Sequence, residues 1–183
     1  MRLKTAAMLA GVAVAAATAG WFGALEIIPR HATDRMWSQF QKAGMKLNRL
    51  SPARIRTAKT AKVVADNADT LTRSAIIDLS DGPMLFTAEI PGDDRYWSVS
   101  LFAHNTDTFF VANDQTVGPG PYRLLIRERG QAGPAEAEAD DVAVSPSRRA
   151  FLIIRAVMRD RNDPAEAQAL QAQVMASQLE PVR

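Results

Sequence analysis

The longest apolar stretch of the chain covers residues 5–28 and directly follows a short basic start. Its length matches the roughly 20 residues that a helix needs to cross the hydrocarbon core of a bilayer. The basic start and the small residues at 17–20 are also typical of a secretory signal. Because apolar residues continue past that point, with Trp21 and Phe22 suited to a membrane interface, we expect residues 1–30 to be a membrane anchor, with a cleaved signal segment as the alternative.

The next segment, residues 31–62, is basic and is expected to contain a juxtamembrane helix followed by a linker. Thr33 or Asp34 can cap a helix that runs to about Leu50. No acidic residue occurs between Asp34 and Asp66, and this part of the chain carries Lys42, Lys46, Arg49, Arg54, Arg56, Lys59 and Lys62. These charges fit two interpretations: a contact of residues 42–62 with anionic lipid head groups, or a solvated helix face and linker.

From residue 74 onward, short apolar runs alternate with turn residues about every ten positions, which is typical of antiparallel strands joined by short connections. The expected strands cover residues 75–79, 84–90, 96–103, 108–112, 122–127, 142–144 and 150–158. Asp163 and Pro164 can begin a helix that runs to about residue 179 and covers the sheet. The pattern therefore predicts an α+β domain over residues 63–183 with mainly antiparallel strands.

Composition limits the location and the partners of this domain. Once the anchor is set aside, the 183-residue chain is long enough for one domain with a sizeable core. The net charge of +2, together with a basic segment that lacks interleaved aromatic residues, gives no reason to expect nucleic-acid binding. Without cysteine, the chain forms no disulfide and gives no sign of its redox compartment. The basic residues after the anchor favour a cytoplasmic domain, whereas the basic start favours export; we expect a single-pass inner-membrane protein with a periplasmic domain.

Catalytic and metal-binding patterns are weak. Ser98, Ser100 and His104 lie on one side of a predicted strand, but Ser100 and His104 would be roughly 13 Å apart along it, beyond hydrogen-bond reach. His104 also has no second histidine or cysteine at ligand spacing. The sequence therefore identifies no catalytic residue and predicts neither a metal site nor a cofactor.

Arg155 is the unusual charged residue, because it interrupts an apolar run at 151–157 that is typical of a buried strand. A buried arginine needs a partner, and a carboxylate such as Asp69 or Asp78 would satisfy it. The alternative is that Arg155 binds an anion in a cleft.

Part of the chain resembles the bacterial domain of unknown function 1254 family. The resemblance rests on Asn67-Ala68-Asp69-Thr70-Leu71, Asp78-Leu79-Ser80 with Gly82-Pro83, and Asp94-Arg95-Tyr96 with Ser98 and Leu101. It extends over roughly residues 63–179 and implies an antiparallel β-sandwich core in an exported protein. The chain is similar to a short, membrane-anchored form without the family's second domain. The full expected fold is therefore a β-sandwich with an N-terminal membrane helix, a juxtamembrane helix and a C-terminal covering helix.

The resemblance carries over particular residues but no reaction. The matching polar residues are Asn67, Asp69, Asp78, Arg95 and Arg155, whereas Thr72, Ala103 and Asn105 depart from the family pattern. We assign Asp78 and Arg95 to structural roles. Asn67, Asp69, Arg155 and His104 are the candidates for ligand binding.

Two functional hypotheses follow. The first is a noncatalytic envelope module, held at the inner membrane, that binds an envelope protein or an envelope ligand. The second is an enzyme or small-ligand-binding protein that uses Asp69, Arg155 and His104 in a cleft between sheet and helix.

Overall fold

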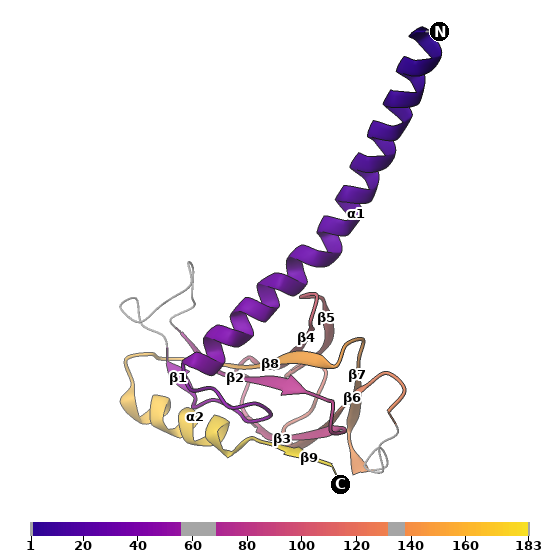
Figure 1. Ribbon diagram of the computed structural model, residues 1–183. Helices are drawn as coiled ribbons and strands as arrows, with labels where there is room; N and C mark the ends of the chain where they lie inside the picture. The colour runs from indigo at the N-terminus through magenta and orange to yellow at the C-terminus, as the bar shows by residue number, and fades with distance from the viewer. Residues whose placement is uncertain (1, 56–68, 132–137, 183) are drawn as a thin grey trace.

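One long helix leads into two packed β-sheets in the computed structural model, which describes residues 2–55, 69–131 and 138–182 (Figure 1). The elements in chain order are α1 (Arg2–Lys42), β1 (Arg54–Ile55), β2 (Thr70–Asp78), β3 (Met84–Ile90), β4 (Trp97–Ala103), β5 (Thr108–Asn113), β6 (Gly120–Glu128), β7 (Asp141–Ser145), β8 (Arg149–Val157), α2 (Pro164–Ala176) and β9 (Gln178–Pro181). The α+β class expected from the sequence is confirmed.

The two sheets pack face to face around the main core. One sheet has the order β1-β2-β8-β4-β5 and the other the order β7-β6-β3-β9. All neighbours are antiparallel except β6 and β7, which are parallel. Alternate residues of the central strands point inward and are fully buried, as in Leu152 and Ile154 of β8. Trp97 and Tyr122 meet edge to face between the sheets, with ring centroids 6.1 Å apart.

The sheets begin earlier and end later than the apolar pattern indicated. The short strand β1 and the preceding residues 48–53 run along the edge of β2, and both lie before the expected domain start at residue 63. The chain after α2 was expected to stay helical to about 179, but it pairs with β3 as β9. Both additions are edge segments stabilised by backbone pairing with a neighbour, which side-chain periodicity does not encode.

Helix α1 is continuous from Arg2 to Lys42, so the separate juxtamembrane helix expected from Thr33 or Asp34 to Leu50 is not formed. The Thr33 hydroxyl donates to the Pro29 carbonyl within the helix instead of capping a new one. Packing explains the continuity, because the last third of α1 lies on the outer face of the five-stranded sheet. There Trp37 is buried in a second apolar cluster with residues of β2 and β8.

The first part of α1 extends away from the sandwich (Figure 1). The most apolar part of the helix is not buried against the rest of the chain. Among the residues that the structure describes, α1 is the one helix long and apolar enough to cross a membrane. Length and composition therefore permit α1 to serve as a membrane span or signal anchor.

Helix α2 covers one end of the sandwich and is capped at both ends. The Asp163 carboxylate accepts the backbone N–H of Ala165 at 2.8 Å and begins the helix as expected. Leu170 and Val174 bury its narrow apolar stripe. At its C-terminal end, the carbonyls face the guanidinium of Arg73 from β2.

Arg73 is a buried arginine that the apolar pattern did not identify. It is only 8% exposed, and its guanidinium donates to the carbonyls of Val174, Met175 and Ser177 at 2.7–3.1 Å. A further bond of 2.6 Å reaches the Ser51 carbonyl. Burial lowers the pKa of Arg73 from its ordinary value, and the negative end of the helix dipole compensates the charge. Arg73 thus joins β2, α2 and the segment after α1.

We expect Arg73→Met to lower the free energy of unfolding by about 3 kcal/mol, because it leaves several buried carbonyls without donors. Urea denaturation of the detergent-solubilised full chain measures this loss. Arg155→Met is the matched control, since it removes an arginine from the neighbouring strand on the opposite face; we expect a change within about 0.5 kcal/mol. Equal losses in the two variants would contradict the assigned role of Arg73.

Candidate functional site

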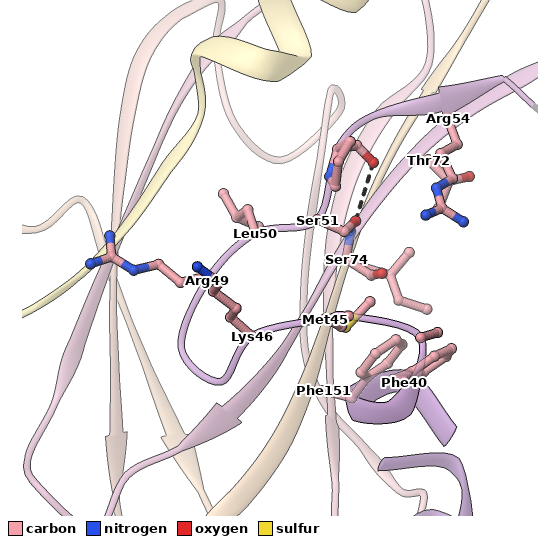
Figure 2. Close-up of a pocket in the computed structure, with 14 residues that line it drawn as sticks. Phe40, Met45, Lys46, Arg49, Leu50, Ser51, Arg54, Thr72, Ser74 and Phe151 are labelled. Atoms are coloured by element: carbon pink, nitrogen blue, oxygen red, sulfur yellow. Dashed lines mark hydrogen bonds between the residues drawn. The ribbon is translucent and has the colours of Figure 1, made fainter. Parts of the chain in front are cut away.

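A cavity of about 560 Å³ lies on the outer face of the five-stranded sheet, where α1 ends (Figure 2). Its volume falls within the range of about 300 to 1,000 Å³ that is typical of ligand pockets. The end of α1, the loop at 43–53 and the first residue of β1 form its walls, and the middle of β2 and β8 forms its floor. The cavity is partly open to solvent.

The loop wall is held in place by hydrogen bonds to β2. Gly44, with φ +89°, ends α1 and turns the chain back toward the sheet. Asn48 then bonds both the backbone N–H and the carbonyl of Asp78, at 2.7 and 2.9 Å. The Ser51 N–H donates to the Ser74 carbonyl, and the Ser51 hydroxyl accepts the Ser74 N–H. These bonds give the cavity a defined wall before β1 begins.

One side of the cavity is apolar. Phe40 of α1 stacks on Phe151 of β8, with ring centroids 5.5 Å apart and an interplanar angle of 13°. Met45 and Ile153 pack against this pair, and Leu50 adds a further apolar side chain from the loop. This side of the cavity can accept a hydrocarbon group.

The other side is cationic and carries hydroxyl groups. Arg54 of β1 lies directly opposite Thr72 of β2 in register, so the two side chains share the outer face. Figure 2 shows Arg54 beside Thr72, whereas Arg49 extends away from them. Lys46 and Arg49 add positive charge to the loop, and the described lining residues include no Asp or Glu.

Arg155 continues the same row, because it lies opposite Thr72 on β8. It is half-buried and points to the outer face, so the expectation of a buried arginine paired with a carboxylate is wrong. Strand alternation explains the difference, since Leu152, Ile154 and Ala156 occupy the inward positions around it. Within the described ranges, no carboxylate or other hydrogen-bond acceptor contacts the Arg155 guanidinium.

His104 lies elsewhere and contributes to the attachment of α1. Its Nε2 is 2.8 Å from Oδ1 of Asp34, a residue of α1. The same oxygen accepts a hydrogen bond of 2.7 Å from Nη1 of Arg149. The Arg149 guanidinium also lies 5.1 Å from the centre of the Trp37 ring. We call Asp34, His104 and Arg149 the helix latch. The Ser147 hydroxyl accepts the backbone N–H of His104 and donates to the Arg149 carbonyl, so these bonds support the loop around the latch.

The structure separates the residues proposed for a cleft. Arg155 pairs with Ser98 of β4, and His104 follows Ser98 by six residues, just past the end of β4, which places the two about 20 Å apart along the sheet. The Asp69 carbonyl accepts the N–H of Met158, three residues beyond Arg155 in the opposite direction. Asp69, Arg155 and His104 therefore do not form one cleft, and Asn67 lies outside the described residues.

Asp78 and Arg95 occupy connecting positions. The Asp78 carboxylate accepts both the N–H and the hydroxyl of Ser80 in the turn after β2. Arg95 binds the Asp93 carboxylate at 2.6–2.9 Å and reaches Glu166 of α2 at 3.2 Å. Its hydrogen bond to Asp93 raises the pKa of Arg95, and the same bond lowers the pKa of the Asp93 carboxyl. These contacts join the β3–β4 loop to the start of α2.

Within residues 2–55, 69–131 and 138–182, no three His, Cys, Asp or Glu side chains lie close enough together to hold a metal ion.

The sequence did not identify the cavity residues as a site, because their grouping depends on strand pairing. Arg54 was assigned only to a basic segment, and its position opposite Thr72 depends on a strand pairing of two residues. Strand alternation was the one signal that could have placed Arg155 on the outer face.

The latch makes a pH dependence predictable. The hydrogen bond from His104, with a further contribution from Arg149, lowers the pKa of Asp34 below 3.8. Asp34 therefore stabilises the folded state at pH values above 3.8, and this contribution is lost as the pH falls through the lowered folded value. We expect Asp34→Asn to cost about 1 kcal/mol at neutral pH, with a difference from wild type that shrinks on acidification below 3.8.

Urea denaturation of the full chain at several pH values checks this expectation. Asp81→Asn, in an exposed turn, is the control and should stay within about 0.5 kcal/mol of wild type throughout. A difference for Asp34→Asn that grows on acidification would contradict the latch.

Comparison with solved structures shows the same fold in one larger protein. The crystal structure of the VPA0106 protein from Vibrio parahaemolyticus matches with a TM-score of 0.68 and 16% identity, covering 84% of this chain and 35% of that one. An uncharacterized protein from Burkholderia cenocepacia matches with a TM-score of 0.45 and 13% identity, covering 61% of this chain and 31% of that one. The chain thus spans about a third of the length of both proteins. At 16% identity, the likeness to the Vibrio parahaemolyticus protein concerns the fold alone.

A comparison with curated protein sequences finds no match. The family model described as "Protein of unknown function (DUF1254)" matches residues 47–178. This span begins in the loop that forms the cavity wall and ends at the start of β9. The chain therefore belongs to the DUF1254 family.

Proposed function

We propose that this protein is a noncatalytic, membrane-anchored binding module whose binding site is the cavity at the end of α1. The observation that carries the proposal is the cavity's division into an apolar side and a cationic side without a carboxylate in its described lining. Such a site attracts an anion and shields part of it from water. Arg54 and Thr72 are the lining side chains best placed to hold the anion, and Arg155 lies opposite Thr72 just outside the lining.

The anchor supports this proposal because α1 joins the cavity to the apolar segment. The same helix contains residues 5–28 and contributes Phe40 to the cavity. We propose that residues 5–28 cross the inner membrane once and that the sandwich lies in the periplasm. An envelope protein is a further candidate partner, because an acidic segment would complement Lys46, Arg49 and Arg54.

Contact of residues 42–62 with anionic lipid is also a proposal, and the described part of that segment is 42–55. Lys42 lies fourteen positions after Ile28 along α1, which corresponds to about 21 Å of helix rise. An upright helix would therefore hold the basic loop away from the head groups, and a tilted helix would bring it closer.

Topology is tested by fusing a reporter enzyme that is active only outside the cytoplasm after Arg183, with the N-terminus examined for processing. We expect activity and an unprocessed chain, because the apolar run continues past the small residues typical of a cleavage site. Activity of a cytoplasmic reporter at the same position would contradict the periplasmic location. A processed N-terminus would contradict the permanent anchor.

Anion binding is tested by thermal unfolding of the full chain in lipid nanodiscs with increasing inorganic phosphate. A ligand that binds only the folded state raises the unfolding temperature, so we expect a larger shift in wild type than in Arg54→Gln. Arg129→Gln, an exposed site after β6, is the matched control for the general stabilising effect of phosphate. Equal shifts in the two variants would contradict a site at Arg54.

A further inference from the structure

The polar and apolar parts of the cavity lie at different positions along the strands, which we call the cationic level and the apolar level. Along the outer face of β8, Arg155 is followed by Ile153 and then by Phe151. This sequence spans about 13 Å at the usual strand rise. Its apolar end lies under Phe40 of α1, so the surface changes from cationic to apolar toward the helix.

The cationic level contains hydrogen-bond donors that the described residues leave unused. Arg54, Thr72, Arg155 and Ser98 lie opposite one another on successive strands. The Ser98 side chain is 0% exposed, and its hydroxyl has no partner within the described residues. Arg54 and Arg155 flank Thr72 with backbones two strand spacings, about 10 Å, apart. A carboxylate above Thr72 can accept from the threonine hydroxyl and one or both guanidinium groups.

A ligand that fits both levels has one anionic group and one hydrocarbon chain. We propose that the cavity binds a fatty-acid carboxylate, with the carboxylate at Arg54 and Thr72 and the chain against Ile153, Phe151 and Phe40. This inference rests on the proposed function and specifies the ligand of the same site. The sequence places no acidic residue between Asp34 and Asp66, so the segment that walls the cavity brings no competing carboxylate.

The position of the cavity favours a single fatty-acid molecule free in solution over a lipid held in the bilayer. With α1 upright, about 21 Å of helix separates the apolar run from Lys42, and a two-chain lipid would have to leave the membrane to place a chain beneath Phe40. A single-chain carboxylate has less apolar area to transfer and reaches the cavity through water.

The test uses the full chain in nanodiscs and a photoreactive dodecanoate, with labelled peptides identified by mass spectrometry. We expect labels on peptides that contain Met45 to Leu50 or Phe151 to Ile153. Arg54→Gln should reduce this labelling about tenfold, the loss expected for one charge-assisted hydrogen bond. Arg129→Gln should not change it, and equal unfolding temperatures of the two variants without ligand show that both are folded.

Three further reagents separate the parts of the inference. Photoreactive dodecanol should label the cavity about tenfold less than dodecanoate, since it lacks the charge. Unlabelled dodecanoate should compete at least tenfold better than hexanoate, because each buried methylene strengthens binding by up to about fourfold. A photoreactive phosphatidylglycerol in the nanodisc should label residues 5–28 and leave the cavity unlabelled.

Each contrary result has one meaning. Equal labelling by dodecanol and dodecanoate would refute recognition of the carboxylate, and equal competition by hexanoate would refute the chain site. Cavity labelling by the phospholipid alone would assign the site to membrane lipid and overturn the inference. If phosphate still stabilises the chain through Arg54 while dodecanoate leaves the cavity unlabelled, the proposed anion site stands and the fatty-acid inference fails.

Discussion

Docking of α1 on the outer face of the five-stranded sheet is the constraint on which the candidate site depends. Trp37 and Phe40 cover only part of that face, because the helix ends at Lys42. Had the helix continued to Leu50, as capping and composition indicated, the returning loop that walls the cavity would not exist. The latch residue Asp34 fixes this arrangement by binding the ends of β4 and β8. Burial of apolar side chains of α1 against the sheet stabilises the docking, and the charged contacts of Asp34 select the orientation of the helix.

Two arginines on neighbouring strands illustrate how position decides the role of a charge. Arg73 faces inward and is satisfied by carbonyls at the end of α2; removing it would leave buried acceptors without partners. Arg155 faces outward at the adjacent level, where no acceptor among the described residues binds it. The first arginine holds elements together, and the second is available to an anion. Arg155 pairs with Thr72, the residue next to Arg73 on β2, and adjacent residues of a strand point to opposite faces of the sheet.

The same helix connects the membrane-length segment to the binding surface. Pro29 follows the apolar run within α1 and removes one backbone hydrogen bond there. Beyond it, packing on the sheet holds the helix in place, so movement of the sandwich relative to the anchor would concentrate near Pro29. Under the proposed anchoring, the cavity at the end of this helix would stay within a limited distance of the membrane.

The sequence by itself determined the elements with strong local signals. The apolar run, the strand at 84–90 and the Asp163 cap all follow from hydrophobicity, alternation or turn chemistry, which act between near neighbours in the chain. The family resemblance added the sandwich, and the expected α+β class was correct.

Only the tertiary structure decided the continuity of α1, the edge strands β1 and β9, and the partners of the arginines. His104 was separated from Arg155 and joined to Asp34, 70 residues earlier in the chain. Each of these outcomes depends on which surfaces meet after the sheets form, and local periodicity carries no information about pairs so distant in sequence.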